Sequence, residues 1–225
     1  MSAETEKNGC AALDDGGVYC ILSVSPEGEG DTLAVTLMRS DGEKRRLHIL
    51  VEQYAELGLR RGELTSEEAE ALLEVGRLCH AIRRGISLLQ YGDQSRRRLG
   101  DKLTARGISR EVASAAVDYL SEKGYIREDD TARLRAEQGV RKLWGPRRIR
   151  EDLRAHGFSI EATDEALEGL CEVDWTENCA AAMRKKYGEI PEDRQERKKL
   201  MAAVLRLGYD SETIRDALRM LLREI

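Results

Sequence analysis

The chain has 225 residues, of which 35% are charged and only 4% are aromatic. This composition favours a helical protein with narrow apolar faces over a compact β-sandwich or barrel, and the length suffices to bury a core. The net charge of −5 hides an uneven distribution, because residues 71–150 contain 18 Lys and Arg against 10 Asp and Glu, a net charge of +8. Such a basic block fits contact with a polyanion or an acidic protein surface, and a solvated helix surface is the simpler alternative.

Several function classes lack their sequence signatures. There is no phosphate-binding loop, no dinucleotide-binding glycine motif and no zinc-protease motif, and the three histidines (His48, His80 and His156) are expected at the surface or in packing. The odd number of cysteines argues against a disulfide framework, and their spacing fits no metal site. No apolar run approaches 18 residues and no signal peptide is recognisable. We therefore expect a cytoplasmic protein that is not an enzyme, with no metal and no cofactor. The cysteines are Cys10, Cys20, Cys79, Cys171 and Cys179.

The first 64 residues predict a tail followed by a small β-rich region. Residues 1–16 are small and polar, which is typical of a disordered tail. Across residues 17–49 apolar side chains recur at every second position in three runs, which predicts a three-stranded antiparallel meander. Ser40-Asp41-Gly42-Glu43 predicts a two-residue type I′ hairpin turn between the last two strands. Residues 51–57 predict a short helix, and a turn over 58–64 closes the region assigned to residues 17–64.

From residue 65 onward the pattern is helical, with Thr65 or Ser66 capping the first long helix. Comparing the chain with itself reveals a unit of about fifty residues. In each unit a helix ends at a glycine, an apolar residue follows, and an N-cap residue begins a second helix. The residues in register are Leu99, Leu103, Gly107, Ile108, Ser109, Ala116, Val117 and Leu120; then Ile149, Leu153, Gly157, Phe158, Ser159, Ala166, Leu167 and Leu170; then Leu200, Val204, Gly208, Tyr209, Asp210, Ala217, Leu218 and Leu221.

A further helix precedes each pair, at about residues 68–90, 128–143 and 175–187. The sequence thus predicts a mainly α protein of tandem three-helix repeats, and a chance alignment of leucines is the alternative. The expected domains are repeat 1 (65–126), repeat 2 (127–172) and repeat 3 (173–225), after the β meander.

The segment 144–157 belongs to the second helix of the central repeat. Pro146 suits a first helical turn, and Gly157 suits a helix end. Arg147, Arg150 and Arg154 form a stripe at helical spacing. We expect surface ion pairs of Arg147 with Glu151 and of Arg148 with Asp152. Trp144 and Trp175 are expected to pack in the core, and Tyr125 and Tyr187 to fill the junctions between repeats.

Several of these segments together resemble the RecX regulatory proteins of bacteria. They are Gly124-Tyr125-Ile126 through Asp130, Trp144-Gly145-Pro146 through Leu153, Gly157-Phe158-Ser159, Ala166-Leu167, Val173-Asp174-Trp175 and Arg184 through Gly188. The β-rich leader followed by Gly58 through Gly62 is similar to longer members, so the resemblance covers about residues 17–225.

Two departures from the family pattern lie at helix starts. Trp144 stands where the family usually has Tyr or another residue. Ser95-Arg96-Arg97-Arg98-Leu99 replaces the usual Ser-x-x-Glu-Leu and is followed by Gly100. A glycine inside a helix costs about 1 kcal/mol relative to alanine, so this helix is expected to be the one most easily kinked or frayed.

The resemblance implies an elongated, curved array of repeats that lies in the groove of the RecA–DNA filament. It implies a non-enzymatic regulator that inhibits the ATPase, strand exchange and coprotease activities of RecA and so modulates DNA repair, recombination and the SOS response. The oligomeric state stays open, and a monomer is the simplest fit to a protein that binds in a groove. Capping, groove binding and filament disassembly all remain open as the mode of inhibition. An alternative is a helical-repeat protein that binds single-stranded or duplex DNA without RecA, although the sequence pI of about 5.5 and the few aromatic residues argue against it.

Clustered cations on rigid helices would suit such a partner, because a guanidinium can bond a phosphate or a carboxylate in two places. We therefore expect a basic strip over the first two repeats. The candidate partner-binding residues are Arg96, Arg97, Arg98, Lys102, Arg141, Lys142, Arg147, Arg148, Arg150 and Arg154.

Overall fold

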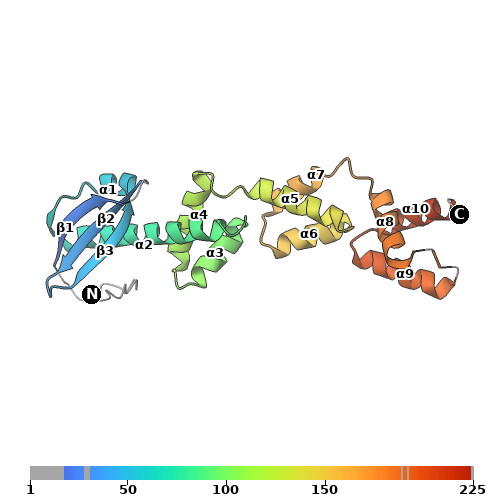
Figure 1. The fold of residues 1–225 in the computed structure, drawn as a ribbon, viewed down its shortest axis with the longest axis horizontal. Coiled ribbons are helices and arrows are strands. Elements are labelled where there is room, and N and C mark those ends of the chain that lie inside the picture. Colours follow the sequence, from blue (N-terminus) through green and yellow to red (C-terminus); the bar gives the residue numbers. More distant parts are fainter. Residues whose placement is uncertain (1–17, 28–30, 189, 192, 224–225) are drawn as a thin grey trace. The chain divides into compact units, whose positions relative to one another are not determined.

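The computed structural model describes residues 18–27, 31–188, 190–191 and 193–223. The predicted disordered tail over residues 1–16 therefore lies outside the described residues. Contacts divide the chain into two compact units, Met1–Leu88 with Lys102–Glu122 and Leu89–Asp101 with Lys123–Ile225. The described residues form a small antiparallel sheet near the start of the chain and ten helices, which confirms the predicted mainly α fold class (Figure 1).

The sheet has four strands rather than the three that the sequence predicts. Strands β1 (Tyr19–Pro26), β2 (Thr32–Arg39) and β3 (Lys44–Leu50) form the expected meander. Strand β4 (Gly62–Leu64) adds to the free edge of β1, giving the order β3-β2-β1-β4. Three residues are too few to show a period of two, so the segment that was expected to be a turn carries a strand that only tertiary pairing reveals.

The hairpin between β2 and β3 also differs from the expectation. The Arg39 N–H donates to the Glu43 carbonyl at 2.9 Å, so the loop has three residues, Ser40 to Gly42. Only Gly42 has a positive φ, at +88°, whereas a type I′ turn needs positive φ at both central residues. The predicted type I′ turn is therefore wrong, and a three-residue loop with a left-handed glycine takes its place.

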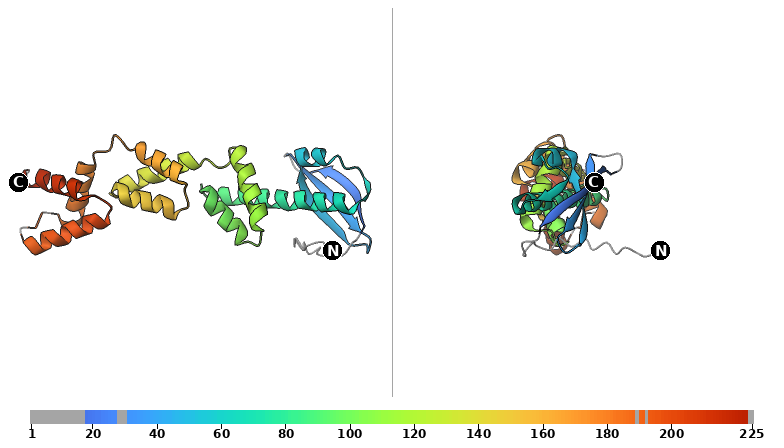
Figure 2. Two further views of the ribbon diagram at one scale, coloured as in Figure 1. Left: turned by 180° about the vertical axis from the view of Figure 1, so that it is seen from behind. Right: turned by 90° about the vertical axis from the view of Figure 1, so that its left-hand side faces the viewer.

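Helix α1 (Val51–Leu57) lies between β3 and β4, and helix α2 (Ser66–Leu89) follows β4. Of the two residues expected to cap α2, Thr65 is the one that does. The Glu68 N–H donates to the Thr65 hydroxyl at 3.2 Å, and the Thr65 N–H donates to the Glu68 carboxylate at 2.8 Å. At Gly76 an added Cβ would lie 3.4 Å from the side chain of Leu47, so α2 packs closely on the sheet. Figures 1 and 2 show α2 running along the sheet and past its end.

Helices α3 (Arg96–Thr104) and α4 (Arg110–Glu122) come next. Gly100 lies inside α3, yet Leu99 and Leu103 on either side of it are both completely buried. Helix α3 runs without a break from Arg96 to Thr104, so the glycine does not interrupt it.

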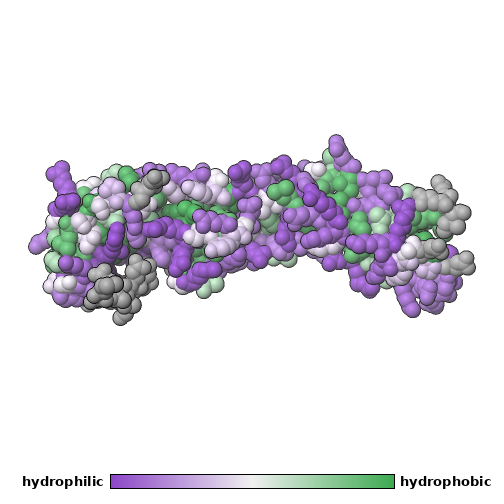
Figure 3. Space-filling model, in the orientation of Figure 1, coloured by the Kyte–Doolittle hydropathy of each residue, from purple (hydrophilic) through white to green (hydrophobic). Residues whose placement is uncertain are grey.

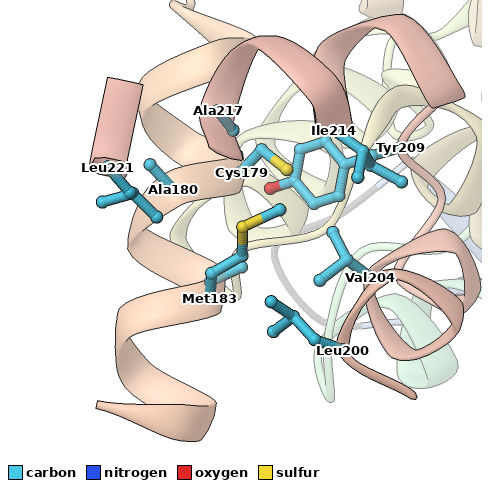
Figure 4. Packing of buried hydrophobic residues seen from close by; sticks show 10 residues of the cluster. Cys179, Ala180, Met183, Leu200, Val204, Tyr209, Ile214, Ala217 and Leu221 are labelled. Carbon is cyan, nitrogen blue, oxygen red and sulfur yellow. The ribbon is translucent and has the colours of Figure 1, made fainter. Parts of the chain in front are cut away.

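Two groups of three helices make up the rest of the chain. The first is α5 (Glu128–Arg141), α6 (Pro146–Ala155) and α7 (Ile160–Glu168). The second is α8 (Trp175–Tyr187), α9 (Arg194–Arg206) and α10 (Ser211–Arg223). Each group has its own apolar core, and in the second group the Tyr209 ring points toward Cys179 and Met183 (Figure 4). The domain boundaries proposed from the sequence stay predictions.

The recurring glycines and caps have the predicted geometry. Gly107, Gly157 and Gly208 have φ of +84°, +80° and +92°, the left-handed conformation that ends a helix. The second helix of each pair begins at a capped residue: Ser109, Ser159 or Asp210. The backbone N–H three residues after the cap donates to the cap side chain, at 3.4, 3.0 and 2.8 Å respectively. The repeated glycine–apolar–cap pattern therefore builds the same helix–turn–helix three times.

The aromatic residues fit the expectations only in part. Trp144 and Trp175 are partly buried against the core of α5–α7, and Trp175 and Tyr187 pack against the core of α8–α10. Tyr125 is 54% exposed, and its predicted role as a filler between repeats stays a prediction. It follows Gly124, which has a φ of +74° in the turn after α4.

Candidate partner-binding surface

Helix α6 presents two different faces. Gly145 is its N-cap and Pro146 opens its first turn. Ile149 and Leu153 are 1% and 0% exposed and form the core face. Arg147, Arg150 and Arg154 are exposed on the other side, as the helical spacing predicts. The apolar pair fixes the helix on the core and leaves the arginine stripe at the surface.

Arg150 and Arg154 are both accessible to a partner. Arg150 Nη2 lies 3.2 Å from Asp164 Oδ1, with both side chains 46% exposed. A surface pair of this kind contributes about 0–1 kcal/mol, so a partner can displace it at little cost. Arg154 is exposed and has no ion-pair partner among the described residues.

Hydrophilic residues cover most of the face seen in Figure 3, with apolar side chains gathered in smaller patches.

Arg148 is used differently, in packing. Its guanidinium lies 4.6 Å from the centre of the Trp144 ring, and Nη1 donates to the Arg206 carbonyl at 3.5 Å. Lys142 Nζ lies 4.9 Å from the same ring centre. Cation–π contacts of this kind hold both cations against the tryptophan. Arg148 is therefore half-buried and less accessible to a partner than the three arginines of the stripe.

The ion pairs predicted along α6 are wrong. Asp152 accepts from Arg135 Nε at 2.6 Å and from Arg135 Nη2 at 3.3 Å, so its partner comes from α5 and not from Arg148. Arg147 forms no ion pair with Glu151 among the described residues. The Thr213 backbone N–H lowers the pKa of Asp210, and the charge of Arg147 contributes less to the same shift.

The start of α6 sits directly on the turn between α9 and α10. The Gly145 N–H donates to the Leu207 carbonyl at 2.7 Å, and the Arg147 N–H donates to the Gly208 carbonyl at 3.2 Å. A Cβ added to Gly208 would lie 2.3 Å from the Arg147–Arg148 peptide at Arg148 N. These donors belong to the first turn of α6, which has no carbonyl partners inside its own helix. We call this contact the second joint.

The start of α3 meets the turn between α6 and α7 at the corresponding place, through a side chain. The Ser95 hydroxyl donates to the His156 carbonyl in that turn at 2.6 Å. Next to it, the Arg96 N–H donates to Glu128 Oε1 at the start of α5, at 3.2 Å. Ser95 is the counterpart of Gly145, and His156 is the counterpart of Leu207. A Cβ added to Gly157 would lie 3.1 Å from Ser95 Oγ, so this contact, the first joint, is looser than the second.

Nine of the ten candidate cations lie in the second compact unit, and Lys102 lies in the first. Arg97 and Arg98 are exposed in the first turn of α3, and Arg96 is half-buried there. Arg141 is exposed and lies 3.5 Å from Glu137, and Lys142 follows at the end of α5. The sequence reading missed Arg135, which bonds Asp152 and His156 from a helix that carries no arginine stripe.

Other kinds of site find no support in the described part of the chain. No group of three or more His, Cys, Asp or Glu residues there could hold a metal ion. Among the described helices, none is both long and apolar enough to span a bilayer.

These features define an α-helical repeat protein with a small β-rich region before the repeats, exposed arginines on successive second helices, and repeated joints between helix pairs. Comparisons with known proteins narrow this class to a family. The family model described as RecX, third three-helix domain, matches residues 172–218. Regulatory protein RecX of Stenotrophomonas maltophilia (strain R551-3) is 38% identical over 143 residues, which cover 61% of this chain and 85% of that protein.

Regulatory protein RecX of Xanthomonas axonopodis pv. citri (strain 306) is 39% identical over 145 residues, again 61% of this chain and 85% of the relative. The chain therefore belongs to the RecX family of regulatory proteins. A crystal structure of regulatory protein RecX superposes with a TM-score of 0.70 over 88% of this chain and 99% of that one, at 19% identity. RecX from Lactobacillus salivarius gives a TM-score of 0.57 over 64% of this chain and 96% of its own, at 18% identity.

Proposed function

We propose that this chain regulates RecA by binding the RecA–DNA filament in its groove and inhibiting the ATPase, strand exchange and coprotease activities. It acts by binding alone, as a monomer, and catalyses no reaction of its own. The observation that carries the proposal is the 38% identity to a regulatory protein RecX across 85% of that relative. The proposed outcome in the cell is modulation of DNA repair and recombination.

The surface of α6 supports the same proposal. A filament groove presents acidic protein side chains and DNA phosphates, and exposed arginines on a rigid helix are complementary to both. Arg150 and Arg154 project from a helix that is fixed by a buried apolar face and by the second joint. Pre-organised arginines lose less conformational entropy on binding than arginines on a loop would.

The proposal is tested by adding the purified chain to preformed RecA filaments and following ATP hydrolysis. We expect inhibition that saturates with added protein. The same preparation is then titrated with bare single-stranded and duplex DNA at two salt concentrations. Tight binding to bare DNA with a steep loss at higher salt, together with unchanged ATP hydrolysis, would support the alternative of a DNA-binding protein that acts without RecA.

A further inference from the structure

A cavity of about 230 Å³ lies at the first joint, between the start of α3, helix α5 and the α6–α7 turn. The two joints explain why it is there. At the second joint the glycine backbone of residue 145 bonds the facing carbonyl directly, so the two backbones touch. At the first joint the side chain of Ser95 spans the distance to the His156 carbonyl. The serine holds the backbones apart, and the space beside it stays open.

The walls of the cavity combine positive charge with an apolar part. Arg98 and Arg135 supply guanidinium groups, Gln138 supplies an amide, and Leu134 and Phe158 supply apolar surface. Phe158 is 8% exposed, whereas Leu134 is 50% exposed although it adjoins a recess. Asp93 is the one acidic residue in the wall, and it is exposed.

The two arginines are held differently. Arg135 donates through Nε and Nη2 to Asp152, and Nη2 also donates to His156 Nε2 at 2.6 Å. An arginine N–H can only donate and a carbonyl can only accept, so His156 Nε2 is the acceptor here and Nδ1 donates to the Asp152 carbonyl at 2.7 Å. These bonds fix the plane of the Arg135 guanidinium and leave Nη1 as its remaining donor. The guanidinium of Arg98 has no ion-pair partner among the described residues, so it can turn toward an anion.

We propose that this cavity receives one carboxylate side chain, Asp or Glu, from the protein part of the bound filament. Arg98 and Arg135 bond its oxygens, and the aliphatic stem of the incoming side chain packs on Leu134 and Phe158. The inference rests on the proposed function, since it names the chemistry by which that partner is held. The cavity is smaller than the roughly 300–1,000 Å³ of pockets that hold drug-sized ligands, which suits a single side chain.

A DNA phosphate is a poorer match for the cavity. A phosphodiester carries a nucleoside on each side, so it contacts convex or flat surfaces more readily than a recess, whereas a side chain can enter by its end. The apolar wall would stay uncovered beneath a phosphate.

The test uses the full chain with Arg98→Lys, which keeps the positive charge and provides an amine. A carbodiimide joins a lysine amine to a nearby carboxyl group as an amide with loss of water. Filaments bound by this variant are treated with the reagent and their cross-linked peptides are identified. Arg133→Lys serves as the control, because Arg133 lies on the neighbouring helix α5 and is 59% exposed but does not line the cavity.

We expect cross-links from position 98 to Asp or Glu of the partner, and markedly fewer from position 133. Arg98→Ala should weaken filament binding about tenfold, a change typical of losing one partner of a charge pair. Helicity should stay unchanged, because the exposed Arg98 side chain supports no core contact. Retained filament binding with no carboxylate cross-link from position 98, or a cross-link from that position to DNA instead, would overturn the inference. A wild-type chain that does not bind filaments at all would instead refute the proposed function.

Discussion

The backbone N–H of Gly145 donates a 2.7 Å hydrogen bond to the carbonyl oxygen of Leu207, 62 residues further along the chain. The bond satisfies a donor at the start of α6 with an acceptor at the end of α9, two groups that helix geometry leaves without partners. Ser95 and His156 form the corresponding contact one repeat earlier. The same joint therefore links successive helix pairs, and it fixes the start of the helix that carries the arginine stripe.

Replacing Gly208 with alanine should open the second joint. The new Cβ would lie 2.3 Å from Arg148 N, and the residue would have to keep a φ of +92°. Left-handed backbone alone costs about 1–2 kcal/mol, and the clash adds to it. We expect the amide protons of Gly145 and Arg147 to lose their protection in hydrogen exchange measurements.

Gly107→Ala is the matched control for that substitution. Gly107 ends α3 with a φ of +84°, but an added Cβ there meets nothing within 4 Å. This variant should show the backbone strain without the clash, and protection at Gly145 and Arg147 should persist. Equal exchange at these two amides in both variants would show that the joint does not depend on the close approach of Gly208.

Tyr209→Phe should destabilise the α8–α10 core through a single hydrogen bond. The Tyr209 side chain is completely buried, and its hydroxyl donates to Asn178 Oδ1 at 2.5 Å. Removing the hydroxyl leaves a partly buried amide oxygen without this donor, which costs about 1–3 kcal/mol. Urea denaturation should detect the loss, while Tyr91→Phe, at a side chain that is 90% exposed, should leave the midpoint unchanged.

The cysteine thiols should differ sharply in reactivity. Burial raises the pKa of Cys79 to about 11 and that of Cys179 to about 12, so at pH 8 both remain protonated in the folded protein. Cys171 is exposed. Because the thiolate is the reactive form, alkylation at pH 8 followed by peptide mass analysis should label Cys171 and spare the other two. Rapid labelling of Cys179 without denaturant would contradict the packing of Figure 4.

The recurring parts of the fold could be predicted because they depend on local physics. Gly157 and Ser159 mark a helix end and a helix start within three residues, and both positions have the expected geometry. The apolar spacing of Ile149 and Leu153 likewise identifies the core face of α6. Helix periodicity and capping act over a few residues, so the sequence alone carries them.

Apart from the hairpin loop at Gly42, the contacts that differ from the expectations join distant parts of the chain. Asp152 pairs with Arg135 on another helix, although Arg148 lies four residues before it. Strand β4 exists because Leu64 pairs with Tyr19, 45 residues away. Neither the joints nor the cavity could be predicted, since which backbone groups of α6 meet the α9–α10 turn depends on how whole helices pack. The role of the arginines in binding stays a prediction.

The central claim is that the arginine stripe of α6 contacts the RecA filament, and a charge-matched pair of variants tests it most directly. One variant replaces Arg147, Arg150 and Arg154 with alanine, and the other replaces Arg194, Lys198 and Lys199, three exposed cations of α9. Both lose three positive charges, and circular dichroism should show unchanged helicity in each.

The measurement is the concentration of each variant that halves ATP hydrolysis by preformed RecA filaments. The α6 variant should need roughly tenfold more protein than wild type, since each surface charge contact contributes about 0.5 kcal/mol, and the α9 variant should match wild type. Equal inhibition by the α6 variant and wild type would contradict the claim.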